Sequence, residues 1–410
     1  MTTRRLGPDD MDASLRLGAE AFGERPAGPP AGPAPAGPPS VAPTEPAPPW
    51  PPEGIVALGA FEGDDLVAKL NGRPYDSWFH GGRVATFGIA GVTVAAERRG
   101  EGLLTPLMDE ILAQARRQGA VISTLFPTAP GIYRRFGYEL VAELTTVSVP
   151  TAALQRLGRA DGIRTRRATE GDVDAVRECY DRWGAQRNGP LTRDGVMFPA
   201  DAAAWLSSFT GVTLALDTDD TVQGFVSWRR GPGYGPEARI GAEDLVWTSG
   251  PARDALLGVL GSFAAVTPTA HLETSGTDEL ALALPVTATT VVERSPYMLR
   301  VLDVPAAFRA VRPAAGVSGS VVFAVAGDAH GGTDGTYRLE VGGGEARCEP
   351  STEAPATTFS SRGLALTWSG VLPLQRVVAE GLATAHGTGA DLGLWDALGL
   401  SRPTHIRDYF

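Results

Sequence analysis

The amino-acid sequence predicts an α+β protein of several domains, and three observations lead to this prediction. The chain has 410 residues, which is more than one ordinary domain needs. The first 150 residues follow the order helix, β-meander, helix, strand, helix, strand. A segment near Thr165 repeats the N-terminal pattern, and the composition changes again near Met298. We therefore expect domains at residues 1–150, 163–297 and 298–410.

Composition and charge exclude several classes of protein. The net charge is −11 and Lys69 is the single lysine, so a nucleic-acid-binding protein is disfavoured. The sequence contains no apolar run of about 18 residues and no apolar segment at its start, so we expect neither a membrane span nor a secretory signal. These features predict a cytoplasmic protein without membrane or nucleic-acid partners.

Cysteine and histidine positions argue against a metal cofactor. Cys179 and Cys348 fall in different predicted domains, which disfavours both a disulfide framework and a cysteine metal site. The five histidines form no pair with the spacing of metal ligands. We therefore expect no bound metal.

The first predicted domain is interrupted by a proline-rich segment. An amphipathic helix pattern covers residues 7–22, and 13 of the 33 prolines lie between Pro26 and Pro52. Proline fixes φ and lacks an N–H donor, so residues 26–52 are interpreted as an extended or disordered insertion. Strand-like runs then cover residues 54–95, with a hairpin turn at Glu62–Asp65.

A helix, a strand, a short helix and a strand complete the first predicted domain. Apolar residues recur at helical spacing over Leu103–Gln118, and Gly119 is expected to end that helix. A strand at 120–126, a short helix around 131–139 and a strand at 144–150 follow.

The chain then starts a second time. At an offset of 162 residues, six residues of the N-terminal segment recur, which suggests two copies of one fold. The pairs are Thr3 and Thr165, Arg4 and Arg166, Arg5 and Arg167, Asp10 and Asp172, Asp12 and Asp174, and Ala13 and Ala175. From Met298 a helix, a β-meander and closing helices predict a further domain that ends at Phe410.

The stretch "VTVAAERRGEGLLTPLM" (Val92–Met108) predicts an anion-binding turn. A strand leads into a turn containing Gly100 and Gly102, and a helix begins directly behind it. Unpaired N–H groups and the positive end of the helix dipole attract phosphate or pyrophosphate, and Arg98 and Arg99 add charge. A mononucleotide P-loop would need Lys-Ser/Thr after the second glycine, and a dinucleotide fingerprint would need another spacing. A plain glycine-rich connection remains the alternative.

Two motifs in this region carry a family resemblance. "VTVAAERRGEGLL" is similar to the coenzyme A loop of the GCN5-related N-acetyltransferases (GNAT), Arg/Gln-x-x-Gly-x-Gly/Ala; Arg99 and Gly102 match, whereas Leu104 departs. "GIYRRFGYE" (131–139) resembles the second motif of that superfamily, Tyr-x-x-x-Gly-Phe/Tyr, whose tyrosine is Tyr133 in this sequence. The second copy has "WTSGPARDALL" where the first has its Arg/Gly turn, so we expect that copy to lack the coenzyme A loop.

The whole chain resembles the actinobacterial Eis (enhanced intracellular survival) family. Further similar segments are "YDRW", "LRVLDVPAA", "EARCEP" and the aromatic C-terminal residue. The resemblance implies an α+β fold of tandem acetyltransferase domains, the first active, followed by a sterol-carrier-protein-like domain. It also implies a homohexamer and acetyl-CoA as co-substrate.

The resemblance places a cofactor site and two catalytic groups on this sequence. Tyr133 would act as general acid, its alternative role being ring packing, and the terminal carboxylate of Phe410 would act as general base. No other base stands beside the motifs, and a frayed C-terminus is the alternative for Phe410. The expected acetyl-CoA-binding residues are Val92, Thr93, Val94, Arg99, Gly100, Glu101, Gly102, Leu103, Leu104, Thr105, Thr128 and Ala129.

Three functions remain open at this point. The first is acetyl transfer to primary amines of polyamine-like or aminoglycoside-like small molecules, and the second is the same chemistry on protein lysines. The third is a non-catalytic protein that binds an apolar ligand, which the intact turn and Tyr133 disfavour. Because the first helix–loop–helix of the family lines the amine pocket, residues 26–52 are predicted either to alter the substrate range or to hang free beside the pocket.

Overall fold

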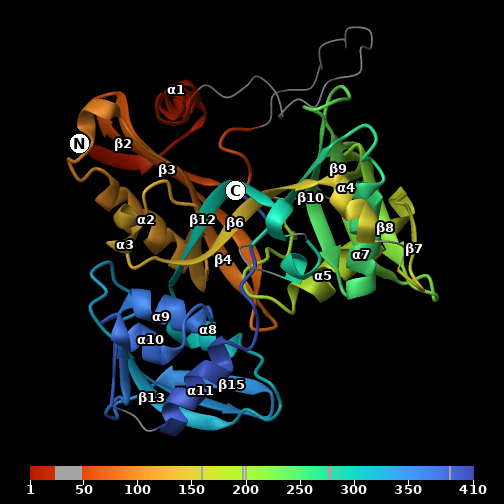
Figure 1. Ribbon diagram of the computed structural model, residues 1–410. Coiled ribbons are helices and arrows are strands. Elements are labelled where there is room, and N and C mark those ends of the chain that lie inside the picture. The colour runs from red at the N-terminus through yellow and green to blue at the C-terminus, as the bar shows by residue number, and fades with distance from the viewer. Residues whose placement is uncertain are drawn as a thin grey trace.

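A computed structural model describes most of the chain and divides it into two sheets with their helices (Figure 1). The predicted insertion at 26–52 lies outside the described residues except for its last four positions. Within the described ranges, no helix is both long and apolar enough to cross a membrane. The described residues are 1–23, 49–157, 160–195, 198, 201–275, 279–284, 286–386 and 389–410.

One large sheet extends across the first three hundred residues. Among the described residues it has twelve strands in the order β1-β2-β3-β4-β5-β12-β6-β11-β10-β9-β8-β7. The strands are β1 (Thr2–Arg5), β2 (Val56–Glu62), β3 (Asp65–Phe79), β4 (Gly82–Val94), β5 (Ile122–Leu125), β6 (Glu139–Pro150), β7 (Arg164–Arg167), β8 (Gly211–Leu216), β9 (Val222–Arg230), β10 (Arg239–Trp247), β11 (Thr269–Thr274) and β12 (Thr290–Val301).

The two halves of this sheet repeat the same order of strand pairing. In the first half, β1 to β4 pair antiparallel in succession, and β4 pairs parallel with β5. In the second half, β7 to β10 pair antiparallel in succession, and β10 pairs parallel with β11. The strand that follows each set crosses over. β6 pairs antiparallel with β11 of the second set, and β12 pairs antiparallel with β5 of the first set. β6 and β12 also pair with each other, so the two halves are joined by continuous hydrogen bonding.

Helices cover the first half near their predicted places, although the short helix predicted around 131–139 ends at Arg134, and the strand predicted at 144–150 begins at Glu139. The amphipathic pattern at Leu103–Gln118 folds as a helix one residue shorter at each end, and Gly119 follows it with φ +79°. That helix buries five of the six residues of the predicted apolar face. The helices of this half are α1 (Met11–Phe22), α2 (Leu104–Arg117) and α3 (Pro130–Arg134).

The repeated N-terminal segment folds alike in both halves. Arg4 and Asp10 form a two-pronged ion pair at 2.7 and 2.8 Å, and Arg166 and Asp172 form the same pair at 2.7 and 2.6 Å. In each half the aspartate also accepts from a backbone N–H three residues earlier, at 2.8 Å. The helices of the second half are α4 (Thr151–Leu154), α5 (Val173–Gly184), α6 (Ala202–Ser207) and α7 (Gly250–Gly261).

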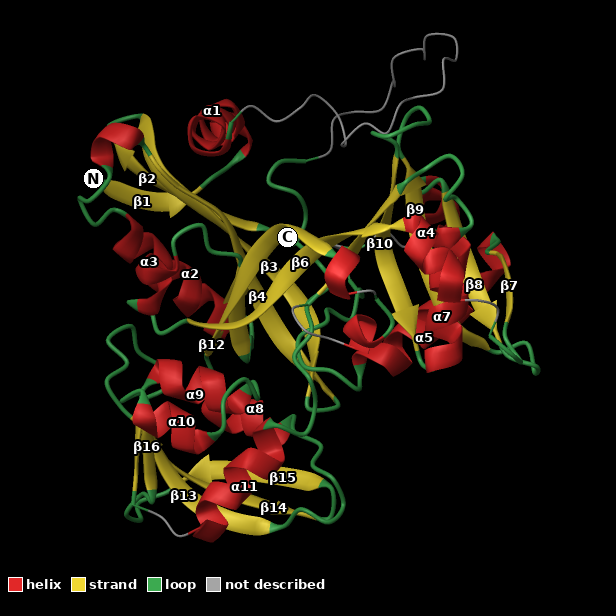
Figure 2. Ribbon diagram, viewed as in Figure 1, coloured by secondary structure: helices red, strands yellow, loops and turns green. Residues whose placement is uncertain are grey.

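The remaining chain forms the lower body in Figure 2, in which helices lie against a smaller sheet. Within the described residues this sheet has five strands in the order β15-β14-β13-β16-β17. Phe323, Phe359 and Trp395 pack edge to face at its centre, each less than 2 % exposed. Its elements are α8 (Val304–Arg309), β13 (Gly319–Val325), β14 (Gly335–Gly342), β15 (Glu345–Pro350), β16 (Thr357–Phe359), α9 (Ser361–Trp368), α10 (Leu374–Ala379), β17 (Ala383–Ala385) and α11 (Gly389–Gly399).

Single-turn helices complete the fold. These short 3-10 turns lie at Pro8–Asp10, Ala96–Arg98, Gln155–Leu157, Glu170–Asp172, Glu279–Leu282 and Val286–Ala288.

β12 passes through the position where the sequence predicted a boundary, between residues 297 and 298. The helix expected from Met298 onward begins only at Val304, because Met298–Val301 is the last part of β12 and is buried among strands β5 and β6. A continuous apolar run fits a buried strand as well as a helix. The chain therefore enters the lower body directly from the centre of the large sheet.

An arginine at the end of β12 ties the large sheet to the lower body. Arg300 is completely buried and its Nη2 lies 2.8 Å from both carboxylate oxygens of Asp328. The same side chain donates to the backbone oxygens of Phe136 and Gly331. When one partner of a buried ion pair is removed, the other keeps a buried charge whose desolvation is no longer compensated, and the folded state is destabilised.

Replacement of Arg300 by methionine (Arg300→Met) should therefore destabilise the protein by about 3–5 kcal/mol, because Asp328 keeps a buried and uncompensated charge. Urea denaturation of the variant and the parent measures the loss. Arg347→Met is the matched control, because the Arg347–Glu349 pair is exposed, and it should change stability by less than about 0.5 kcal/mol. Equal losses in the two variants would contradict the assigned role of the buried pair.

Candidate active site

β4 carries a bulge at the residues predicted to meet the cofactor. Lys69 of β3 lies opposite Thr93 and Asn71 lies opposite Ala90, so Gly91 and Val92 share one position of the partner strand. Gly91 adopts φ +60°, a conformation that glycine accommodates easily. The bulge redirects the last residues of β4.

Beyond the bulge one edge of β4 is unpaired. Its parallel pairing with β5 runs from Thr86 opposite Ile122 to Ile89 opposite Leu125. In the part of the chain that the structure describes, no strand pairs with this edge from Ala90 to Val94. Backbone N–H and C=O groups that lack a strand partner are available to an extended ligand, as the pantetheine arm of coenzyme A is.

The turn after β4 has the open glycine geometry that the sequence predicted. Gly100 and Gly102 adopt φ +88° and +79°, and a side chain built on either would meet no atom within 4 Å. Among the described residues, no side chain caps the first turn of the fourteen-residue helix α2 behind them. The Thr105 N–H donates to the backbone oxygen of Gly102 at 3.1 Å and Pro106 has no N–H, so the N–H groups of Leu103 and Leu104 are the ones that can bind an anionic group.

The charged residues of the turn divide into two groups. Arg98 forms ion pairs with Glu62 and, at 2.8 Å, with Glu101, so its charge is compensated within the turn. Arg99 is exposed and its Nε lies 3.4 Å from the backbone oxygen of Val94. Arg99 is therefore better placed than Arg98 to bind a pyrophosphate, because Glu101 forms an ion pair with Arg98.

Tyr133 lies beside the cofactor elements. It belongs to α3, is 6 % exposed, and shares one hydrophobic cluster with Leu103, Leu104, Val92 and Val94. Burial raises the pKa of its phenol to about 12. Among the described residues the phenol has no hydrogen-bond partner. It is thus a protonated donor at neutral pH, with its O–H free for a ligand.

The predicted residues Thr128 and Ala129 lie between β5 and α3. Both are exposed, and Ala129 immediately precedes the first turn of α3. The structure thus brings Tyr133 together with the end of β4 and the start of α2 in one hydrophobic cluster, and the roles of Thr128 and Ala129 stay predictions.

The C-terminal residue lies against the first half of the large sheet. The ring of Phe410 is 5.0 Å from that of Tyr75 on β3, 5.4 Å from Phe126 after β5, and 6.3 Å from Tyr297 on β12. A side chain at Gly88 of β4 would come within 2.5 Å of the Phe410 ring. The C-terminus is therefore packed beside β4, and a residue larger than glycine at position 88 would displace it.

A buried ion network from the second half fixes the C-terminal tail. Arg193 donates to Asp408 at 2.8 Å and to both oxygens of Asp244 on β10 at 2.7 and 2.9 Å. Tyr180 of α5 donates to Asp408 at 3.2 Å, and Arg407 donates to the backbone oxygen of Glu273 at 2.9 Å. Burial raises the pKa of Asp408, and the Arg193 cation opposes this shift.

A cavity of about 380 Å³ adjoins Phe410 at the junction of the two halves. Its lining contains three carboxyl side chains and three guanidinium groups, and it includes Phe410, the residue that bears the terminal carboxylate. A site of this size and polarity suits a small organic cation. The lining residues are Arg73, Tyr75, Leu144, Leu191, Arg193, Phe198, Glu243, Glu273, Arg407, Asp408, Tyr409 and Phe410.

Sequence reasoning missed most of this cavity. Arg193, Glu273 and Asp408 stand in no local motif, and Arg193 and Asp408 are separated by 215 residues. The sequence signal for this cavity is the segment "HIRDYF", in which Arg407 and Asp408 directly precede the two aromatic C-terminal residues.

Comparison with known proteins agrees with this geometry. Residues 2–141 match the family model of the acetyltransferase (GNAT) domain. An N-acetyltransferase of Streptomyces avermitilis, named as uncharacterized, is 31% identical over 353 residues, which cover 81% of this chain and 83% of that protein. The chain belongs to the GNAT family, and it is an acetyltransferase.

Solved structures extend the similarity to the full length. A GCN5-related N-acetyltransferase from Kribbella flavida has a TM-score of 0.79 at 27% identity and covers 100% of this chain and 98% of its own. Eis1 from Mycobacterium abscessus has a TM-score of 0.68 at 20% identity, with 100% of both chains covered, and is thus similar in fold. GNAT domains use acetyl-CoA, which fits the unpaired β4 edge and the glycine turn.

Glu273 gives the cavity a measurable pH dependence. Burial raises the pKa of this carboxyl to about 8, although Arg407 opposes the shift. A raised carboxyl pKa stabilises the folded state fully below the ordinary value near 4.5, and this contribution is lost as pH rises towards 8. Glu273→Gln keeps the neutral form at every pH, so its melting temperature relative to the parent should increase from pH 5 to pH 9. Thermal melts of Glu353→Gln, at an exposed carboxylate, are the control, and parallel curves for Glu273→Gln and the parent would contradict the shift.

Proposed function

We propose that this protein is an Eis-type, acetyl-CoA-dependent N-acetyltransferase that acts on primary amines of polyamine-like or aminoglycoside-like small molecules. The observation that carries the proposal is the cavity beside Phe410, which adjoins β4 and carries Glu243, Glu273, Asp408 and the C-terminal residue on its lining. An ammonium group entering this cavity meets acceptors on several sides, at the strand where the thioester would lie.

The residues of the first half hold the co-substrate. The unpaired edge of β4 at Val92, Thr93 and Val94 would bind the pantetheine arm, and Gly100–Thr105 with Arg99 would bind the pyrophosphate. When bound, acetyl-CoA supplies the acetyl group as a thioester. A backbone N–H on the β4 edge would polarise the thioester carbonyl, in the manner of an oxyanion-hole donor.

Tyr133 and Phe410 are assigned to the two proton transfers. The Tyr133 phenol, protonated at neutral pH, would donate its proton to the departing sulfur. Burial raises the basicity of a thiolate leaving in the same surroundings, which helps this transfer. The terminal carboxylate of Phe410 would accept the proton that the amine loses, directly or through water. The packing of Phe410 on β4 and the anchoring of Asp408 support this role.

The repeated strand order supports the domain arrangement that the family resemblance implies. The recurring strand order and the repeated Arg–Asp pair favour two acetyltransferase folds, the second without a coenzyme A loop. The sheet and helices after residue 301 are assigned to a sterol-carrier-protein-like domain. A homohexamer and a cytoplasmic location are proposed from the resemblance and the composition alone.

Removal of the Tyr133 hydroxyl tests the proton donor. Tyr133→Phe should lower kcat by about 10²- to 10⁴-fold, because the phenol protonates the leaving group. The variant should unfold at nearly the temperature of the parent, since the phenol has no hydrogen-bond partner among the described residues. Steady-state kinetics and thermal melting measure the two effects.

Tyr138→Phe is the matched control for Tyr133→Phe. Tyr138 is buried nearby and donates to Ser123 Oγ at 2.6 Å, so its loss should cost about 0.5–1.5 kcal/mol of stability. It should leave kcat close to the parent value. A Tyr133→Phe enzyme with unchanged kcat would remove Tyr133 from the reaction.

Turnover on an amine panel tests the function. We expect acetyl-CoA-dependent acetylation of an aminoglycoside and a diamine, with a lysine-containing peptide as the competing substrate class. Faster acetylation of the peptide would favour the protein-lysine alternative.

Two residues added after Phe410 should lower kcat/KM at least about tenfold, because the carboxylate leaves its position. The same two residues added before Met1 are the control, and an active extended enzyme would exclude Phe410 as the base.

A further inference from the structure

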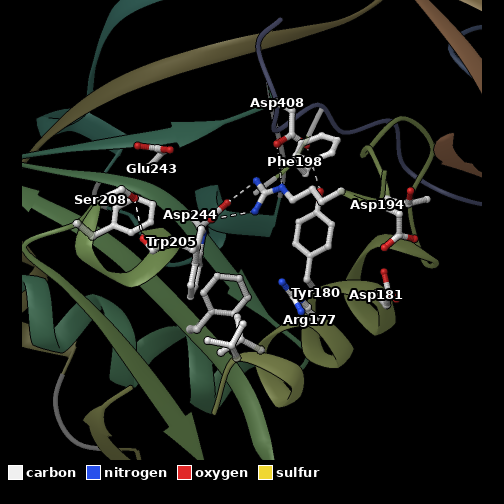
Figure 3. A pocket seen from close by; sticks show the side chains of 16 residues that line it. Arg177, Tyr180, Asp181, Asp194, Phe198, Trp205, Ser208, Glu243, Asp244 and Asp408 are labelled. Atoms are coloured by element: carbon white, nitrogen blue, oxygen red, sulfur yellow. Dashed lines mark hydrogen bonds and ion pairs between the residues drawn. The ribbon is translucent and has the colours of Figure 1, made fainter. Parts of the chain in front are cut away.

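The two groups proposed for proton transfer lie on segments that need support from other parts of the fold. Phe410 ends an irregular tail, which the second half fixes: Arg193 donates to Asp408 at 2.8 Å and to Asp244 at 2.7 and 2.9 Å (Figure 3). Tyr133 belongs to α3, a helix of five residues, which is too short to be stable by itself. Since its phenol has no hydrogen-bond partner among the described residues, its direction depends on ring packing and on the backbone that carries it.

The chain after Tyr133 folds into a tight turn that leads into β6. The carbonyl oxygen of Tyr133 accepts from the N–H groups of Phe136 at 2.9 Å and Tyr138 at 3.2 Å. Gly137 in this turn adopts φ +78°, and a side chain built on it would lie 3.0 Å from Ser361 Cβ, at the start of α9. The turn that carries Tyr133 is therefore packed directly against the lower body.

A buried carboxylate joins the helix of Tyr133 to the lower body. Glu139 is 5 % exposed and accepts from Arg134 Nε at 3.0 Å and from Arg362 Nε at 2.7 Å. Arg134 directly follows Tyr133 in α3, whereas Arg362 lies on α9. We call these three charged side chains the Glu139 bridge, because they connect α3 of the first half to α9 of the lower body.

The Glu139 bridge is ionised and has a defined geometry. Burial raises the pKa of the Glu139 carboxyl, but the hydrogen bonds from Arg134, Leu140 and Arg362 outweigh this effect and hold the pKa below its ordinary value. A guanidinium group presents its N–H donors in one plane, so each arginine binds the carboxylate in a fixed direction. If one arginine is removed, Glu139 keeps the other as a partner.

The same region has further contacts with the lower body. Arg300, which is held by Asp328 of the lower body, donates to the backbone oxygen of Phe136. The ring of His330 lies 4.5 Å from the ring of Phe136, and His330 Nδ1 lies 2.7 Å from the carboxylate of Asp109 on α2. The lower body thus contacts the turn after α3 beyond the bridge, and it also contacts the helix behind the glycine turn.

We propose that Arg134, Glu139 and Arg362 are positioning residues for acetyl transfer: through them the lower body holds α3, so that the Tyr133 phenol points to the departing sulfur. This inference rests on the proposed role of Tyr133 as proton donor. Displacement of a reacting group by about 1 Å can cost about 10²-fold in rate, so a donor on a helix of five residues needs such support. The lower body has a part in the reaction that does not require it to bind a ligand.

Arg362→Met and Arg134→Met cut the two ends of the Glu139 bridge. Each should lower kcat at least about fivefold, because the phenol is displaced, and should leave the KM for acetyl-CoA within about twofold of the parent value. Steady-state kinetics with the best amine of the panel measures both. Arg338→Met is the matched control, because its side chain is 35 % exposed, against 34 % for Arg362, and pairs with Glu353 inside the lower body. It should keep the parent kcat.

A double-mutant cycle separates positioning from a general loosening of the fold. In the Tyr133→Phe background, Arg362→Met should change the remaining kcat by less than about twofold, because the group that Arg362 positions is already absent. Loss of kcat by the same factor in both backgrounds would overturn the proposal. Parent kcat in both Arg362→Met and Arg134→Met, with a lowered kcat in Tyr133→Phe, would overturn it and leave the proposed function intact.

Fluorine NMR of protein labelled with 3-fluorotyrosine gives a readout without turnover. The signal that Tyr133→Phe removes belongs to Tyr133, and it should shift or broaden in Arg362→Met and Arg134→Met but not in Arg338→Met. The signals of the other tyrosines show whether each variant is folded. An unchanged Tyr133 signal in both bridge variants would overturn the inference. An inactive parent enzyme would refute the proposed function, and the Tyr133 signal would still decide whether the lower body holds α3.

Discussion

The exchange of β6 and β12 between the two halves of the large sheet is the constraint on which the rest of the structure depends. Each of these strands leaves its own half and pairs with the last strand of the other, β11 or β5. Because β6 and β12 also pair with each other, neither half can move without breaking backbone hydrogen bonds. The junction between the halves is therefore rigid, and the active-site cavity lies at that junction.

A rigid junction allows remote parts of the chain to supply one site. The first half contributes β4, the glycine turn and Tyr133; the second half contributes Arg193, which holds Asp408 of the C-terminal tail. Arg300, at the end of β12, ties the lower body to the same sheet through Asp328. The second half thus fixes the position of Phe410, two residues after Asp408.

Local motifs and periodicity predicted the first half well. The helix expected at Leu103–Gln118 is α2, the turn expected at Glu62–Asp65 joins β2 to β3, and the family match confirms an acetyltransferase. These features depend on residues close together in the chain, where spacing reflects geometry directly. The expected helix from Met298 was wrong over its first six residues, four of which are the end of β12, because burial on both faces gives a strand the same apolar run as a helix. The roles of Tyr133 and Phe410 remain predictions.

The sequence by itself determined most elements of the first half, the glycine turn, the tyrosine motif and the repeated Arg–Asp segment, since each is encoded within a few dozen neighbouring residues. Only the tertiary structure decided which distant groups meet. It exchanged β6 with β12, brought Arg193 to Asp408 across 215 residues, and enclosed Glu273 in the cavity beside Phe410. Such contacts arise from the packing of whole sheets and leave no pattern in the local sequence, so they could not be predicted from it.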